Sequence, residues 1–222
     1  MTQFKSGSGS RLNKREKGCF LILLLFVALS VVILWVPNGG TPRGPASKAV
    51  FQCREIGLAL VKYASDHGGR FPEGHSSTEV FQKLIDDHDV DDPALFFYPL
   101  AGKVKPGTNT LKPENVGWDV TCCVDADSPD SLPLVFITGY KVDYMAGAGV
   151  HLLKKETSFT WTDWWNAKAV RLYFVAVFYK NFSARALMSP DNSGLFPGFI
   201  PADFDSKEEI YRQLTPDGEL KP

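Results

Sequence analysis

The chain of 222 residues carries 24 basic and 25 acidic side chains, a formal net charge of −1, and 44% of its residues are hydrophobic. This is the composition of a globular protein, and the length allows one sizeable domain plus an anchoring segment. Because five of the basic residues and one acidic residue precede Trp35, the rest of the chain is mildly acidic, which argues against nucleic acid as a partner.

An uncharged apolar run near the amino terminus predicts a membrane anchor. Residues 19–36, CFLILLLFVALSVVILWV, number 18 without a charge and at ~1.5 Å per residue nearly cross a ~30 Å hydrocarbon layer. Trp35 stands where an interfacial aromatic belongs, and the basic segment 1–18 predicts a cytoplasmic amino terminus with an exported body. A cleaved signal peptide is the alternative, but its apolar region usually runs roughly 7–15 residues. We therefore expect an uncleaved, single-pass signal anchor.

Residues 37–45 are rich in Pro and Gly, which disfavour helix interiors, and predict a flexible tether. An amphipathic helix is expected within 46–72, because apolar residues spaced by four, three, four and three form one seam: Ala49, Cys53, Ile56, Leu60 and Tyr63. Gly68-Gly69 can adopt the positive φ that ends a helix, and Pro72 keeps the chain from resuming it. Such a helix gains most of its stability from the surface on which its apolar seam packs.

A second, shorter helix is expected after Pro72. Ser76 and Glu79 fit a capping box, with Ser76 as the N-cap residue and Glu79 at the third helical position. The buried stripe of this helix consists of Val80, Phe81, Leu84 and Ile85. The acidic segment 86–92 follows, and Pro93 closes it.

Several β-strands are expected after a surface loop at 102–115. Residues 116–124 read as a strand, and 125–133 as a turn-forming run. Residues 134–137 and 140–144 read as two strands, or as one strand interrupted at Thr138-Gly139.

A hairpin over 169–188 is the clearest β signal. Both alternating sets of residues in 170–179 are largely apolar, so this strand is expected in the centre of a sheet with both faces covered. Lys180-Asn181 is expected to supply the turn, since Asn tolerates positive φ, and 182–188 to return. The remainder, 190–222, reads as loop with one short helix near 207–214. The order of helices and then strands predicts an α+β body.

Three segments resemble one protein family: CREIGLALVKYASDHGGRFP (53–72), STEVFQKLIDDHDVDDPALFFYP (77–99) and VAVFYKNFSARALM (175–188). They are similar to pseudopilin-like proteins of bacterial type II secretion and type IV pilus systems, of the planctomycete–verrucomicrobial type. The resemblance implies a transmembrane helix leading to an amphipathic helix packed on an antiparallel sheet, within an extracytoplasmic domain spanning 46–222. It also implies an aromatic strand after the second helix, with Tyr98-Pro99 where the family has Cys-Pro.

The resemblance further implies a location and partners. The protein is expected in the bacterial inner membrane, with its amino terminus cytoplasmic and its body periplasmic. Its expected partners are membrane lipid, through the amino-terminal helix, and other secretion-system or pilin-like subunits, with no small-molecule cofactor. Pilin precursors are cut after a Gly that precedes Phe, with Glu fifth in the mature chain, whereas here Cys19 follows Gly18 and Leu23 is fifth. This degenerate leader predicts an accessory, non-polymerising member.

The cysteines suggest a disulfide. In an oxidising periplasm, Cys53 could pair with Cys122 or with Cys123, which are adjacent to each other. The alternative is that Cys53 is a small buried hydrophobe, the usual state of a cysteine on a helix seam.

Two further groups of residues invite a binding hypothesis. Asp125, Asp127 and Asp130 supply oxygen donors for calcium, or form an acidic solvated turn. Trp161, Trp164 and Trp165, with Phe159, form either a platform for sugars or a partner protein, or part of the core.

No pattern in the sequence asks for an enzyme. The four histidines are scattered, and neither a nucleophile elbow nor a phosphate-binding glycine loop is present. We therefore expect no catalytic, cofactor-binding or metal-binding residues. The leading hypothesis is an anchored subunit that acts through protein contacts, and the alternative is an anchored extracytoplasmic module that binds glycans or peptides.

Overall fold

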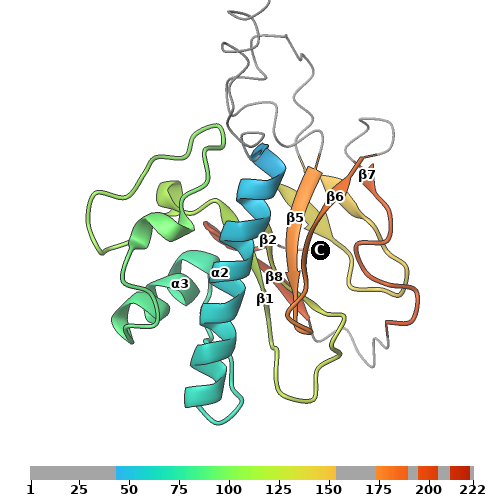
Figure 1. Ribbon diagram of the computed structural model, residues 1–222, viewed down its shortest axis with the longest axis horizontal. Coiled ribbons are helices and arrows are strands. Elements are labelled where there is room, and N and C mark those ends of the chain that lie inside the picture. The colour runs from blue at the N-terminus through green and yellow to red at the C-terminus, as the bar shows by residue number, and fades with distance from the viewer. Residues whose placement is uncertain (1–43, 154–173, 190–194, 205–210, 221–222) are drawn as a thin grey trace, which may run out of the picture. The chain divides into compact units, whose positions relative to one another are not determined.

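Helix α2 (Pro45–Asp66) lies against a six-stranded antiparallel sheet in the computed structural model, which describes residues 44–153, 174–189, 195–204 and 211–220 (Figure 1). The seam predicted from the sequence is buried over most of its length: Ala49, Cys53 and Ile56 are fully buried, Leu60 is 2% exposed, and Tyr63 is half-buried. The helix is followed by Gly68 and Gly69, both at positive φ. The predicted helix is therefore confirmed and ends just before the two glycines. Pro45, expected to end the tether, instead occupies its first turn, where a missing N–H costs nothing.

Helix α3 (Ser77–Asp86) follows as expected and buries the predicted apolar stripe. The Ser76 hydroxyl accepts a hydrogen bond from the Glu79 N–H at 3.2 Å. The Glu79 carboxylate accepts from the His75 N–H at 2.8 Å, one residue earlier than in a standard capping box. One of the amide groups left open at this helix entrance, that of Glu79, is thus satisfied by a side chain, and the second bond fixes the residue just before the helix.

The aromatic strand implied after α3 is not formed. Residues Pro93–Phe96 instead make the 3₁₀ helix η1, in which the Asp92 side chain accepts from the Ala94 N–H at 2.8 Å. Pro93 fixes the φ angle of a turn, which favours this local structure over an extended chain. The loop expected at 102–115 contains a second 3₁₀ helix, η2 (Pro113–Asn115).

The main sheet has the strand order β6 (Ala184–Met188), β5 (Phe174–Tyr179), β2 (Pro133–Ile137), β1 (Trp118–Cys122), β8 (Arg212–Thr215), β9 (Gly218–Glu219). All of its neighbouring strands are antiparallel. Every residue of β5 is buried, and β5 lies between β6 and β2. The expected central strand is therefore confirmed over its described residues.

A second sheet of three short strands has the order β3 (Tyr140–Val142), β4 (Val150–Leu152), β7 (Leu195–Phe196). The break expected at Thr138-Gly139 is real, with Gly139 at a φ of 101°. It separates β2 and β3 into different sheets, so the two-strand reading of 134–144 is correct. Strand β4 was not predicted from the sequence.

The two faces of the main sheet receive different partners. Val135 lies opposite Phe178, and the next pair is Phe136 with Val177, so these two pairs point to opposite faces. On the first face, the Cys53 thiol of α2 donates to the Val135 carbonyl at 3.3 Å. On the second face, the Phe136 ring packs edge-on against Phe199 at 5.5 Å.

A buried glutamine connects the second sheet to this second face. The Gln213 side chain of β8 donates to the Asp119 carboxylate and to the Tyr140 carbonyl, each at 2.6 Å, and accepts from the Val142 N–H at 3.0 Å. Helix α2 and the three-stranded sheet therefore cover opposite faces of the six-stranded sheet. The α+β class with antiparallel sheets is confirmed.

The carboxyl-terminal prediction was wrong in part. The short helix expected near 207–214 overlaps strand β8, which pairs with β1 in the register Val120 to Leu214. Residues 205–210 lie outside the described part of the chain. Because β8 has only four residues, its pairing with a strand about ninety positions earlier decides its structure, and no local pattern reveals that pairing.

The hairpin turn occurs where it was predicted, with one difference. The Tyr179 carbonyl accepts from the Phe182 N–H at 3.0 Å, so Lys180 and Asn181 are the central residues of the turn. The positive φ, 64°, falls on Phe182 rather than on Asn181. This is the geometry of a turn followed by one left-handed residue, a common hairpin connection of three residues.

The predicted anchor, 19–36, lies outside the described residues, as does nearly all of the predicted tether. Within the part of the chain that the structure describes, no helix has both the length and the apolar character needed to span a bilayer.

Candidate functional site

An open groove of about 790 Å³ runs along helix α2, on the side away from the buried seam. Its other wall is the segment 89–95, which follows α3 and includes most of η1. We call it the α2 groove. Its lining consists of Lys48, Phe51, Gln52, Glu55, Leu58, Ala59, Lys62, Asp89, Val90, Asp91, Asp92, Ala94 and Leu95.

Two large apolar side chains on α2 are exposed along this groove. Phe51 is 47% exposed and Leu58 is 42% exposed. They stand seven positions apart, so they project from one face of the helix, two turns from each other. Single exposed apolar residues are ordinary on protein surfaces, but several that share one groove are typical of an interaction surface.

The far wall of the groove is held to α2 by one amide side chain. Gln52 donates hydrogen bonds through its Nε2 atom to the carbonyl of Leu95 and, at 2.6 Å, to that of Phe97. These carbonyls belong to the turn at η1, where no strand ladder satisfies them. Gln52 therefore fixes the spacing of the two walls.

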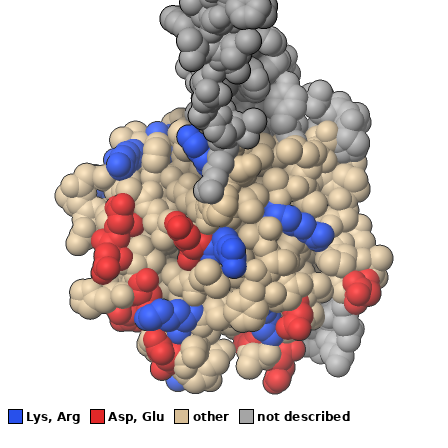
Figure 2. Space-filling model, viewed as in Figure 1, with Lys and Arg blue, Asp and Glu red and all other residues tan. Residues whose placement is uncertain are grey.

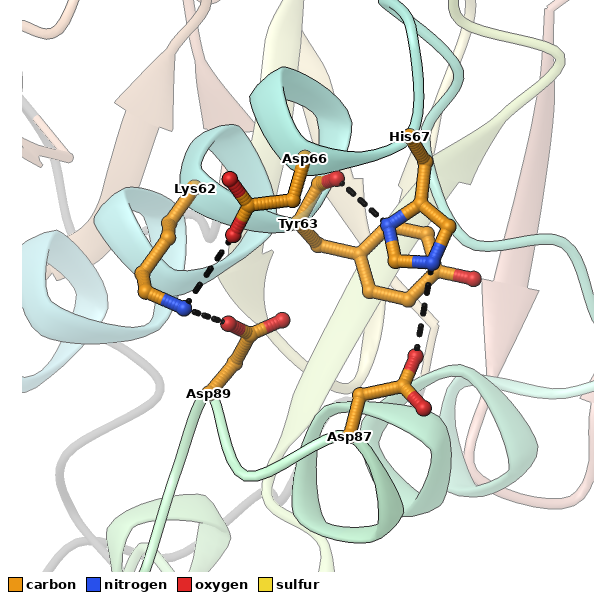
Figure 3. A network of polar contacts seen from close by, with 6 residues as sticks. All are labelled: Lys62, Tyr63, Asp66, His67, Asp87 and Asp89. Carbon is orange, nitrogen blue, oxygen red and sulfur yellow. Dashed lines mark hydrogen bonds and ion pairs between the residues drawn. The ribbon is translucent and has the colours of Figure 1, made fainter.

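A charged network closes the end of the groove nearest the carboxyl terminus of α2 (Figure 3). The Lys62 ammonium donates to the Asp89 carboxylate and, at 3.3 Å, to that of Asp66. The hydrogen bond to Asp89 and then that to Asp66 raise the pKa of Lys62. Lys62 and Asp66 are both exposed, so water screens that pair, whereas the Asp89 side chain is only 3% exposed. The contact between Lys62 and Asp89 therefore ties the segment at residue 89 to α2.

The same figure shows a second contact between the ends of α2 and α3. The His67 ring stacks on Tyr63, with the centroids 3.8 Å apart and the planes 8° from parallel. Its Nδ1 atom donates to the Tyr63 carbonyl at 2.8 Å, and its Nε2 atom lies 3.7 Å from the Asp87 carboxylate. Desolvation and the nearby Asp87 charge raise the pKa of Tyr63. These contacts hold the carboxyl end of α3 beside that of α2.

The surface around α2 has no single sign of charge. Figure 2 shows acidic and basic side chains interspersed on this face, with uncharged surface between them. Such a surface has no strong field to recruit a highly charged ligand. The apolar side chains in the groove are therefore its main distinguishing feature.

The predicted disulfide is not formed, and Cys53, Cys122 and Cys123 are all free thiols. Cys53 is fully buried under β2 and β5, and burial raises its pKa well above the ordinary value. Its thiol donates to the Val135 carbonyl, so it faces the sheet centre, whereas Cys122 and Cys123 lie at the end of β1. The alternative reading, a small buried hydrophobe, is the correct one.

Cys122 and Cys123 bring their sulfur atoms within 3.4 Å of each other. Cys122 is half-buried at the end of β1, and Cys123 is exposed with a φ of 63°. Burial, and next the neighbouring Cys123 thiol, raise the pKa of Cys122 to about 12. The pair is therefore a partly accessible dithiol.

The acidic turn predicted at 125–133 is present, but it is organised around a lysine. The Lys180 ammonium donates to the carbonyls of Ala126, at 2.6 Å, and of Ser128. Asp125 accepts from the Ser128 hydroxyl at 2.7 Å, which is the main cause of a lowered Asp125 pKa. Within the described residues, no three His, Cys, Asp or Glu side chains are placed to hold a metal ion, so the structure does not assemble the proposed calcium site at Asp125, Asp127 and Asp130.

Phe159, Trp161, Trp164 and Trp165 lie outside the described residues, so the choice between binding platform and core stays a prediction. Sequence reasoning did not identify the α2 groove. The signal for it was present in Phe51 and Leu58, which are apolar yet fall off the seam of their own helix. The far wall could not be foreseen, because it depends on how residues 89–95 fold back against α2.

No protein-family model, no curated protein and no solved structure matches this chain. The function is therefore argued from the fold and from the groove themselves.

Proposed function

We propose that this protein is a membrane-anchored, pseudopilin-like subunit, an accessory component of type II secretion or pilus-type machinery in a bacterial inner membrane. Its work is protein–protein contact outside the cytoplasm, and this role needs no catalytic residue. This proposal rests on one observation, which is that two sides of α2 lie in different environments. One side of the helix is buried against an antiparallel sheet, and another side presents Phe51 and Leu58 along an open groove.

The arrangement of α2 and the sheet supports the family resemblance. A long helix begins at residue 45 and packs on β5, β6 and β2 of an antiparallel sheet. The resemblance implies this order of elements, with a membrane helix before it. The anchor at 19–36 and the orientation of the chain in the membrane rest on the sequence alone.

Crosslinking from the groove tests the contact. A photoreactive amino acid would replace Leu58 in the full chain, expressed in the cells from which the protein comes. The matched control position is Val104, which is also exposed, at 59%, and lies outside the groove. The expected result is a crosslink from position 58 to another membrane-anchored protein, and none from position 104. Equal labelling from both positions would contradict the use of this groove.

Intact mass of the membrane-extracted protein tests the anchor separately. An unprocessed chain that stays with the membrane supports a signal anchor. Loss of residues 1–18 would show prepilin-type processing, and the subunit would then be a candidate for polymerisation. Recovery of a processed chain in the soluble fraction would refute the anchor.

A further inference from the structure

The adjacent thiols of Cys122 and Cys123 have a geometry suited to a ligand rather than to each other. Consecutive Cα atoms across a trans peptide are ~3.8 Å apart, whereas ordinary disulfides span ~4.4–6.8 Å between Cα atoms. A bond between neighbouring cysteines would therefore be strained and readily reduced. The structure holds both groups as thiols, with the sulfur atoms at 3.4 Å.

The distance between the two sulfur atoms sets the sulfur–atom–sulfur angle at any single atom that binds both of them. For a bond of about 2.3 Å to each sulfur, a separation of 3.4 Å corresponds to an angle of about 95° at the bound atom. That angle is too small for a linear two-coordinate ion, and it is below the value of roughly 109° for a tetrahedral zinc site. It suits a three-coordinate, pyramidal centre whose lone pair narrows its bond angles.

The protonation of the pair also disfavours an ordinary metal ion. A metal site needs its cysteines as thiolates, and a structural zinc site needs four ligands. Burial raises the pKa of Cys122 to about 12, so its proton is retained at neutral pH. The described residues offer no group of three metal-binding side chains. A ligand that removes the thiol protons by condensation avoids both difficulties.

We propose that Cys122 and Cys123 form a dithiol site for trivalent organoarsenicals and chemically similar thiophilic metalloid oxides. The reaction is a condensation without a change of oxidation state. Two S–H bonds and the arsenic–oxygen bond break, two arsenic–sulfur bonds form, and the oxygen leaves as water with both thiol protons. The exposed Cys123 sulfur attacks the arsenic first, and the half-buried Cys122 sulfur then attacks the same arsenic atom and closes the ring. This site is independent of the contact surface on α2.

The test uses phenylarsine oxide and the reduced full chain in a mild detergent. The expected product carries one phenylarsenic group per chain, with the loss of two thiol hydrogens, as seen by intact mass. Because two sulfurs hold it, the adduct is expected to survive excess 2-mercaptoethanol and to be released by 2,3-dimercaptopropanol. The variants Cys122→Ser and Cys123→Ser are expected to lose this resistant adduct, and Cys53→Ala to retain it.

Competition with 2,3-dimercaptopropanol measures how much the fold strengthens the binding of the arsenical. A preformed site is expected to hold the arsenical about tenfold more tightly in the folded chain than in the chain unfolded by urea. Three results would overturn the proposal: no resistant adduct on the wild-type chain, a resistant adduct on Cys123→Ser, or equal retention by folded and unfolded chains. Closure of the reduced pair to a disulfide before it takes up the reagent would also overturn it. Circular dichroism of each variant shows whether its fold is intact.

Discussion

The packing of α2 on the sheet requires that position 57 carry no side chain. A methyl group added at this position would lie 2.1–2.4 Å from three atoms of the Phe178 ring. Carbon atoms in contact normally stay ~3.5–4.0 Å apart. Phe178 is fully buried in β5, so the ring has little room to move away. We therefore expect Gly57→Ala to force α2 away from the sheet.

Two opposing terms set the size of this effect. Alanine is better than glycine inside a helix by about 1 kcal/mol, which would stabilise the variant. Overpacking of a filled core costs ~1–3 kcal/mol and occasionally more, and an overlap of this depth belongs at or beyond the upper end. We expect a net loss of roughly 2 kcal/mol in the free energy of unfolding. At a urea dependence of about 2 kcal/mol per molar, the unfolding midpoint would fall by about 1 M.

Urea unfolding of the full chain, followed by far-ultraviolet circular dichroism in mild detergent, measures this change. Ser65→Ala is the matched control, because Ser65 is exposed on the same helix, and its free energy of unfolding should change by less than about 0.5 kcal/mol. A second substitution, Phe178→Leu, should recover part of the loss in the double variant, since leucine lacks the ring atom Cε1 and its smaller side chain can rotate away from the added methyl group. Should Gly57→Ala prove as stable as the wild-type protein, α2 does not approach β5 this closely.

Three further predictions concern local features of the structure. Ser76→Ala removes the N-cap hydrogen bond of α3 and should cost about 1 kcal/mol of unfolding free energy in the same assay. Phe182→Gly should raise stability by up to about 1 kcal/mol, because this exposed residue is held at a φ of 64° that glycine adopts without strain. Stability should also fall with alkali. Burial raises the pKa values of Cys53 and Tyr98, so above about pH 8.5 the unfolded chain releases protons that the folded chain retains. The urea midpoint, measured at several pH values from 7 to 10, should therefore fall. A midpoint that does not change over this range would contradict the burial of these two groups.

Features governed by neighbouring residues could be predicted from the sequence. The seam of α2, its glycine end and the N-cap of α3 each depend on side chains within about one turn of the helix. The central position of β5 could also be inferred, because both faces of a buried strand must be apolar. These sequence patterns depend only on residues that are close together in the chain, and they were sufficient to predict the α+β class.

Features that depend on distant pairing could not be predicted. Strand β8 has four residues, and it is extended because it pairs with β1 and because Gln213 reaches the second sheet from it. The cysteines of the sequence suggest a disulfide, but Cys53 faces the middle of the sheet, whereas Cys122 and Cys123 lie at the end of β1. The position of a side chain relative to the strands is a tertiary property.

The positions of Gly57 and Leu58 explain how one helix can serve both the core and a surface. Neighbouring residues of a helix point about 100° apart, so Gly57 meets Phe178 while Leu58 stands in the groove. Close contact at Gly57 brings the helix axis towards the sheet, and Gln52 then holds the far wall at a fixed distance from the helix. The shape of the groove therefore depends on the packing beneath it. A change on the buried face that displaces α2 should disturb contacts made through the groove, whereas a change at Leu58 should disturb those contacts and leave the core intact.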